Sequence, residues 1–141
     1  MLTEKDYCDY DTCVALKELG IDCDSPYYYD NKRHLRQCGM GHYSTTNANC
    51  MGVILAIHLY DAQKWLREEK KIEVVILGDN YIGGPYHVDI YAESGPIYLD
   101  RGNGHSFYES ALNEGIKEAV KLLKEVLAMR EIDFNRDSDE W

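Results

Sequence analysis

Long apolar runs are missing from this chain. The longest is MGVILAIHLY at 51–60, far short of the roughly 20 residues that a helix needs to cross a bilayer. The sequence also shows no signal peptide, in which a basic stretch precedes an apolar one. We therefore expect a cytoplasmic protein with no membrane partner.

Basic residues are scarce as well. The chain has 15 Lys and Arg against 25 Asp and Glu, which gives a formal net charge of -10. Proteins that follow a phosphate backbone use clustered Lys and Arg, so we expect no nucleic-acid polymer as partner. An acidic surface instead favours solubility and, at most, a basic partner.

Sequence motifs of common enzymes are also missing. The chain has no Gly-x-x-x-x-Gly-Lys of a P-loop, no nucleophile elbow, no zincin helix and no pair of catalytic carboxylates. We assign no catalytic residue and expect no cofactor. The absence of a motif does not exclude an enzyme, so a protein without catalytic activity is the favoured interpretation and catalysis stays open.

The five cysteines form no evenly spaced framework and lack a secretory context, a pattern typical of reduced thiols. Cys23, Cys38, His42 and Cys50 offer the atoms that zinc prefers. Their gaps of 14, 3 and 7 residues contain no Cys-x-x-Cys pair, the specific part of zinc motifs. We predict no metal site and leave zinc binding by these four residues open.

Tyrosine, by contrast, is abundant, with 12 Tyr against 2 Phe. Its rigid apolar ring with a polar end suits half-exposed surfaces and binding faces. Ordinary sheet positions that Phe also fills account for the same composition, and we prefer this plainer interpretation.

Three segments are predicted to be helical: 9–20, 59–70 and 107–128. Each places an acid in its first turn, namely Asp11, Asp61 and Glu109, where a carboxylate is stabilised by the helix dipole. In the third helix the apolar residues recur at helical spacing. They are Leu112, Ile116, Ala119, Leu123 and Val126.

Strands are predicted between the second and third helices. The continuous apolar run at 72–77 is typical of a central strand, and 86–91 alternates between two faces. The turn-rich segment between them favours antiparallel pairing, and 96–99 gives a short third strand. The segment 23–49 has no clean period, and we expect a hairpin of 27–29 with 33–38 followed by an irregular loop. The segment 53–57 is either a strand or the start of a helix.

These elements predict an α+β domain over 1–128: a small antiparallel β-sheet packed against two or three helices, with the long C-terminal helix central. Within it, 23–49 forms an irregular hairpin and loop insertion. The acidic, aperiodic segment 129–141 is expected to be a flexible tail.

Two segments carry a family resemblance: YDAQKWLREEKKIEVVI and FYESALNEGIKEAVKLL. They resemble small proteins encoded by phages and prophages of gut bacteria. In those, a helix ending Trp-Leu-Arg-Glu is followed by strands and by a closing helix that begins Tyr-Glu-x-Ala and continues Gly-Ile-Lys-Glu-Ala. The match is good over 60–76 and 107–123, loose over 10–20 and poor over 23–49. The resemblance implies an accessory protein of a mobile element that binds or blocks host components, and it supplies no catalytic residue.

The best candidate binding site is the loop DRGNGHS before the third helix. Backbone N–H groups at a helix N-terminus bind anions, and side chains of the loop add donors. A plain turn capped by Ser106 accounts for the same residues, and we rank that interpretation first. The candidate ligand-binding residues in this loop are Arg101, Gly102, Asn103, Gly104, His105 and Ser106.

His87 and Asp89 are a second candidate, because they share one face of the alternating strand at 86–91. A polar, solvated sheet face gives the same pattern and is the preferred interpretation. Together with the context that the phage resemblance implies, these residues lead us to expect a non-catalytic counter-defence protein in the host cytoplasm that sequesters a small phosphorylated signal or nucleotide. An acidic, Tyr-rich inhibitor of a host protein and a nucleotide-cleaving enzyme are the alternatives, and the sequence leaves homo-oligomers open.

Overall fold

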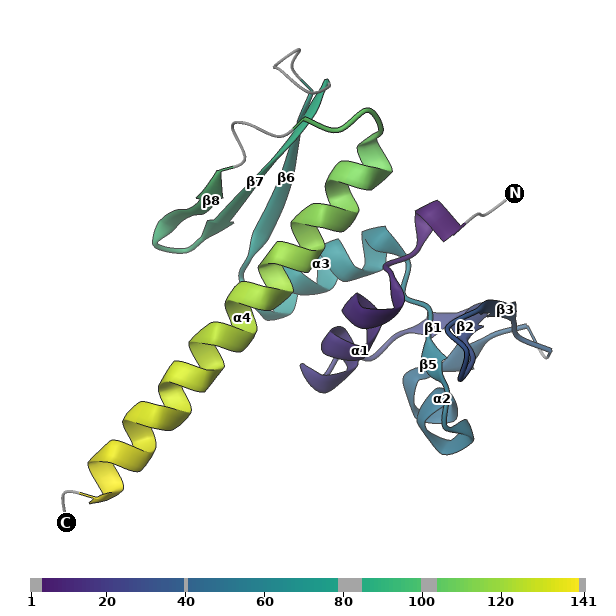
Figure 1. The fold of residues 1–141 in the computed structure, drawn as a ribbon, viewed down its shortest axis with the longest axis horizontal. Helices are drawn as coiled ribbons and strands as arrows, with labels where there is room; N and C mark the ends of the chain where they lie inside the picture. The colour runs from purple at the N-terminus through teal and green to yellow at the C-terminus, as the bar shows by residue number, and fades with distance from the viewer. Residues whose placement is uncertain (1–3, 40, 79–84, 100–103, 140–141) are drawn as a thin grey trace.

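Helix α4, Tyr108–Asp139, is the element around which the other parts of the chain pack in this computed structural model (Figure 1). One side of α4 contacts a three-stranded sheet, and other contacts join it to helices α1, Tyr10–Glu18, and α3, Leu59–Glu69. The structure describes residues 4–39, 41–78, 85–99 and 104–139, apart from the side chains of residue 4 and 130–139. The predicted α+β class with a central C-terminal helix is confirmed.

The sheet packed on α4 consists of β6 (Glu73–Gly78), β7 (Tyr86–Ala92) and β8 (Gly95–Leu99), in this order and antiparallel. Val74 pairs with Ile90 and Ile76 with Val88, which confirms the predicted antiparallel pairing of these two segments. The prediction that 72–77 forms the central strand is wrong, because β7 lies between β6 and β8. The apolar run of β6 is explained by its packing against α3 and α4.

The rest of the chain forms two smaller sheets beside α1. The hairpin of β2 (Tyr27–Tyr29) and β3 (Leu35–Gln37) was predicted, and β5 (Ile54–Leu55) joins it along β2. A further pair joins β1 (Asp24–Ser25) to β4 (Tyr43–Ser44). The prediction of an irregular loop after the hairpin is wrong in part, because helix α2 spans Thr45–Met51. A single turn of 3-10 helix, η1 (Glu4–Asp6), precedes α1.

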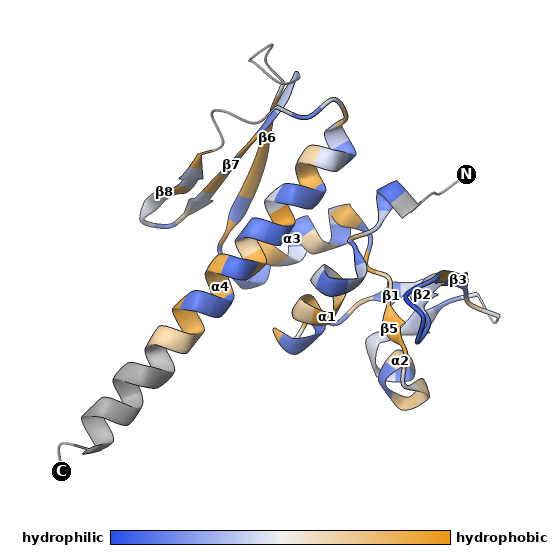
Figure 2. Cartoon of the chain, in the orientation of Figure 1, coloured by the Kyte–Doolittle hydropathy of each residue, from blue (hydrophilic) through white to orange (hydrophobic). Residues whose placement is uncertain are grey.

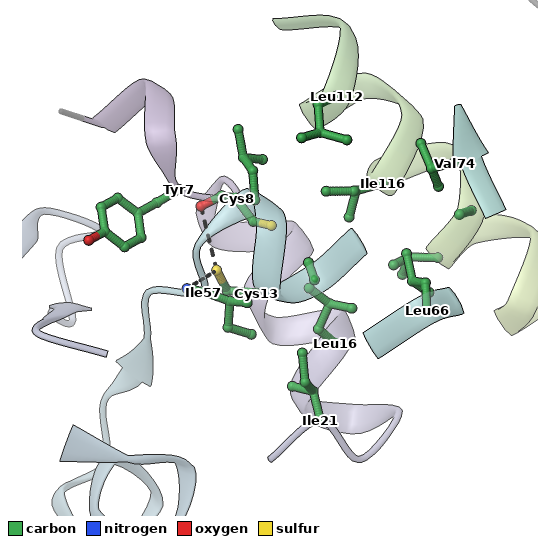
Figure 3. Close-up of a cluster of buried hydrophobic side chains, with 14 of the residues drawn as sticks. Tyr7, Cys8, Cys13, Leu16, Ile21, Ile57, Leu66, Val74, Leu112 and Ile116 are labelled. Carbon is green, nitrogen blue, oxygen red and sulfur yellow. Dashed lines mark hydrogen bonds between the residues drawn. The ribbon is translucent and has the colours of Figure 1, made fainter. Parts of the chain in front are cut away.

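The core lies where α1, α3 and α4 meet the sheet (Figure 3). Leu16 of α1 and Leu59, Ala62 and Leu66 of α3 are buried, whereas Tyr10 at the start of α1 is half-buried. Cys13 fills the space between α1 and β5, where its sulfur accepts a hydrogen bond from the Ile57 N–H at 3.4 Å and donates to the Cys8 carbonyl at 3.5 Å. Buried thiols of this kind act as small apolar side chains.

Gly115 fixes how closely α4 approaches the sheet. A Cβ atom added there would lie 2.6 Å from Cγ1 of Val74 and 2.8 Å from Cγ1 of Val88. Both distances are shorter than carbon atoms tolerate, since nonbonded carbons prefer about 3.5–4.0 Å. Only glycine therefore allows this helix to lie against β6 and β7 at this depth.

The apolar stripe of α4 ends sooner than the sequence predicted, and the helix ends later. Ile116 and Ala119 are buried and Leu123 is half-buried, but Val126 is 45 % exposed and Met129 is 65 % exposed. The helix itself continues to Asp139 rather than ending near 128. Figures 1 and 2 show α4 running past the sheet and α1, with apolar positions continuing into that part.

Replacing Gly115 by alanine should destabilise the fold. Alanine favours a helix by about 1 kcal/mol over glycine, but overpacking at a tight contact costs about 1–3 kcal/mol, so the net effect in a urea titration should be a loss. Adding Val74→Ala to Gly115→Ala should recover part of this loss relative to the sum of the single changes, because it removes the Cγ1 atom nearest the new methyl group. A more stable Gly115→Ala variant would contradict this packing.

The two parts of α4 should respond differently to truncation. Ile116→Ala should lower the free energy of unfolding by about 2–5 kcal/mol, as for other buried aliphatic residues. Val126→Ala should change it by less than about 0.5 kcal/mol, as for an exposed surface position. Equal losses at both sites in denaturant titrations would mean that Val126 is covered in solution.

Candidate functional site

The loop predicted to bind an anion is described only from Gly104 onward. Arg101, Gly102 and Asn103 lie outside the described residues. Gly104 and His105 are half-buried and Ser106 is exposed. The His105 N–H donates to the Tyr86 carbonyl at 2.8 Å, and the Tyr86 N–H donates to the His105 carbonyl at 3.1 Å. This bridge holds the loop beside the start of β7, next to His87.

Ser106 is not the N-cap that the sequence predicted. The Ala111 N–H donates to the Phe107 carbonyl at 3.2 Å, and the helix begins at Tyr108. Phe107 therefore occupies the cap position, and its side chain is exposed. Glu109 lies in the first turn as expected, as do Asp11 in α1 and Asp61 in α3.

His87 and Asp89 lie on the face of β7 opposite α4, since Val88 between them faces Gly115. The preferred interpretation, a solvated polar face, is wrong because His87 is 0 % and Asp89 is 1 % exposed. Asp89 accepts a hydrogen bond from the Tyr91 hydroxyl at 3.2 Å. Burying a polar side chain lowers the stability of a fold unless that side chain is hydrogen-bonded. In this conformation neither is exposed to a ligand.

The proposed zinc ligands are dispersed. Cys38 is buried, Cys23 is half-buried, and Cys50 and His42 are exposed. Among the described residues, no group of three His, Cys, Asp or Glu side chains is placed to hold a metal ion. Burial and the nearby Asp61 raise the pKa of Cys23 to about 11, and burial also raises the pKa of Cys38. Both shifts oppose formation of the thiolate that binds metal.

Three cavities of ligand size open on the described surface. The acidic cleft, about 370 Å³, lies between the end of α1 and α3. Its wall carries one lysine and one indole ring against five carboxylates, which oppose an anion. The residues lining it are Ile21, Asp22, Cys23, Asp24, Asp61, Lys64, Trp65, Glu68 and Glu69. An α1–α4 groove of about 430 Å³ is mainly apolar and includes Ala15, Val120 and Ala128.

The third cavity, about 350 Å³, has the features that ring-bearing anions need, and we name it the tyrosine cavity. It opens between η1, the start of α1, the β2–β3 hairpin and the first turns of α4. It combines aromatic walls with two basic side chains and two small polar ones. Its lining residues are Lys5, Tyr7, Asp9, Tyr10, Tyr29, Arg33, Glu109, Ser110 and Asn113.

The tyrosine rings of this cavity are held firmly. The Tyr29 hydroxyl donates to the Cys8 carbonyl at 2.7 Å, and the Tyr10 and Tyr29 rings meet edge to face with centroids 5.8 Å apart. Tyr7 is buried and points away from Leu112 and Ile116 (Figure 3). Burial, followed by the neighbouring Tyr27, raises the pKa of Tyr7, so its phenol carries no negative charge at neutral pH.

Both basic residues of the cavity stand on aromatic rings. The Arg33 guanidinium carbon lies 4.7 Å from the Tyr10 ring centroid, and Lys5 Nζ lies 4.9 Å from that of Phe107. Such cation–π contacts hold a cation in place while leaving its other donors free to bind. Arg33 also faces Asp11 at 3.6 Å, but both side chains are mostly exposed, and exposed pairs contribute only about 0–1 kcal/mol.

The position of Arg33 is set by the β2–β3 loop. Asp30 accepts hydrogen bonds from the backbone N–H groups of His34 and Lys32 at 2.9 and 2.8 Å and from Arg36 Nε at 2.9 Å. The His34 bond, followed by the Arg36 bond, lowers the pKa of Asp30 to about 2. These bonds hold the loop in a turn in which Arg33 adopts a φ of +65°, a conformation that non-glycine residues seldom adopt.

Two carboxylates also line the cavity, and one of them, that of Asp9, forms an ion pair with a lysine. Asp9 caps α1 by accepting the Thr12 N–H at 2.9 Å and pairs with Lys117 at 3.3 Å. Burial would raise the pKa of Asp9, but the Thr12 hydrogen bonds and the Lys117 charge outweigh it and the pKa is lowered. The two cavity cations then face one further carboxylate, that of Glu109.

The tyrosine cavity was not found from the sequence. Its rings come from three separate segments, and only the excess of Tyr over Phe pointed to a binding face.

No helix among the described residues is both long and apolar enough to span a membrane. Comparisons with protein-family models, curated proteins and solved structures find no match.

The thiols give a direct test of this description. In native protein at pH 8, Cys50 should react rapidly with a thiol reagent, and Cys50→Ser should remove the fast phase. Cys23 should react slowly, because a thiol with a pKa of about 11 is ionised to only about one part in a thousand at this pH. All five thiols should react in guanidinium without reductant. Fewer than five would mean a disulfide, and rapid labelling of the Cys50→Ser variant would contradict the burial.

Proposed function

We propose that this protein is a binding protein without catalytic activity, and that it holds a small phosphorylated ligand with an aromatic ring, such as a nucleotide, in the tyrosine cavity. The observation that carries the proposal is the combination of phenol walls with Lys5 and Arg33 in one cavity of about 350 Å³. This size falls within the range of small-molecule sites, about 300–1,000 Å³.

Each part of such a ligand has a counterpart in the cavity. A flat base packs against the half-buried Tyr10 ring, and base–aromatic stacking contributes about 1–3 kcal/mol per base. A phosphate is bound by Arg33 and Lys5, and hydrogen bonds to charged groups contribute about 1.5–3 kcal/mol. Arg33 gives up only its contact with Asp11 at 3.6 Å, which is weak because it is exposed.

The acidic residues set a limit on the charge of the ligand. Asp9 is paired with Lys117, and Glu109 is the second acidic residue of the cavity lining. A ligand with one phosphate meets two cations and one carboxylate, a favourable balance. Each added phosphate brings further negative charge without a further cation to bind it, so the cavity favours a singly phosphorylated ligand.

The resemblance to phage and prophage proteins supports a biological role for such binding, namely interference with host defence. A small accessory protein in the host cytoplasm that retains a nucleotide signal would lower the concentration of that signal and weaken host defence. A nucleotide-cleaving enzyme is the competing interpretation of the same cavity. After incubation with the protein, recovery of the nucleotide intact by mass spectrometry supports sequestration, whereas appearance of cleavage products supports the enzyme.

A second candidate function is protein binding through α4. Val126, Leu127 and Met129 are exposed large apolar side chains on the part of α4 that extends past the sheet. The mainly apolar α1–α4 groove lies next to them along the same helix. A host protein could pack an apolar face against this surface, a mode of inhibition that differs from the acidic, Tyr-rich surface expected from the sequence.

Charge removal at Arg33 should separate affinity from stability. Arg33→Gln should weaken the tightest-binding member of a panel of AMP, GMP, CMP and UMP about tenfold or more in calorimetric titrations, because a charge-assisted contact is lost. The melting temperature should hardly change, since the Arg33 side chain is exposed and its ion pair is weak.

Lys32→Gln is the matched control. Lys32 lies beside Arg33 in the same loop, is exposed, and is not among the residues that line the cavity. The Lys32→Gln substitution removes the same charge from the protein as Arg33→Gln, so a general electrostatic effect would weaken nucleotide binding equally in both variants. Equal weakening, or no heat from wild-type protein with any of the four nucleotides, would overturn the proposed site.

A further inference from the structure

Asn113 lines the tyrosine cavity from α4, one turn after Glu109. Its carboxamide oxygen has less than 1 Å² of accessible surface and no hydrogen-bond partner among the described residues. Buried polar atoms in folded proteins are nearly always hydrogen-bonded, and each exception needs an explanation. Stability alone does not explain a polar side chain here, because an apolar residue of similar size leaves no acceptor unsatisfied.

The chemistry of this carboxamide matches one edge of a nucleobase. An amide presents an acceptor and a donor side by side, and asparagine pairs in this way with the amino group and the adjacent ring nitrogen of adenine. Rotation about the terminal torsion of Asn113 brings either atom toward the cavity, because that torsion has a broad, low-energy range. A base packed on the phenol walls lies in the same cavity as this amide.

We propose that Asn113 selects the ligand of the tyrosine cavity, and that the ligand class is a nucleotide whose base carries an exocyclic amine next to a ring nitrogen, as adenine does. This rests on the proposed function and adds to it the identity of the base edge. Once the carboxamide has turned toward the cavity, the Asn113 oxygen accepts from the amine and gains the partner that it lacks in the conformation described. Lys5 and Arg33 contribute affinity for the phosphate and no selectivity between bases.

The test compares AMP with purine riboside 5′-monophosphate, which lacks only the amine. Calorimetric titration of wild-type protein should give an affinity for AMP about tenfold or more above that for the analogue, because a site built around a hydrogen bond rejects the ligand that cannot make it. Asn113→Leu should bind both ligands equally, with the affinity that wild-type protein shows for the analogue. The melting temperature of this variant should be unchanged or higher, since it loses a buried acceptor without a partner.

Glu118→Gln is the control, because Glu118 is a polar residue of the same helix that does not line the cavity; it should retain the preference for AMP. Equal affinities of wild-type protein for the two ligands would overturn the role of Asn113 and leave nucleotide binding intact. Absence of binding by either ligand at millimolar concentration, together with no binding by the other nucleoside monophosphates, would overturn the proposed function and this inference together. The wild-type comparison needs no variant, so it decides the matter even if Asn113→Leu does not fold.

Discussion

The close contact between α4 and the sheet at Gly115 is the constraint on which the other parts of this structure depend. Without a side chain at this position, the helix lies directly against Val74 and Val88. This depth sets the level of the next turns, in which Ile116 and Ala119 reach the buried residues of α1 and α3. It also sets the height at which the first turns of α4 face η1 and the β2–β3 hairpin. The shape of the tyrosine cavity is therefore a consequence of a helix–sheet distance on its far side.

The contact between α1 and α4, which we call the seam, contains both an ion pair and a buried polar atom without a partner among the described residues. Asp9 and Lys117 form an ion pair that joins the two helices, with Asp9 in the tyrosine cavity and Lys117 in the α1–α4 groove. Asn113 places a buried oxygen in the cavity wall without a partner among the described residues. Natural proteins retain such unfavourable groups most often where function requires them. The unsatisfied oxygen of Asn113 is consistent with the binding role proposed for the tyrosine cavity.

The elements with clear periodicity were predictable from the sequence. Leu59, Ala62 and Leu66 recur at helical spacing and are buried, and the alternation at 86–91 matches the register of β7. Helix α2 was missed because Thr45–Met51 buries only Ala48 and so has no apolar period. The reciprocal capping of Ser44 and Asn47 was its one local signal. Alternation also shows that His87 and Asp89 share a face, but it cannot show that this face is covered. The tyrosine cavity could not be predicted, because it depends on the distances among Tyr7, Tyr29 and Arg33, which only long-range packing determines.

The length of α4 has a mechanical consequence. With a rise of about 1.5 Å per residue, the part of the helix from Gly115 to Asp139 is about 36 Å long. Measured from the contact with the sheet at Gly115, the helix has a short part at the cavity and a long part on the opposite side. A rotation of about 5° at this contact moves the far end by about 3 Å, whereas the turn that carries Asn113 moves by only a few tenths of an ångström. Small changes at one end of the protein are therefore magnified at the other.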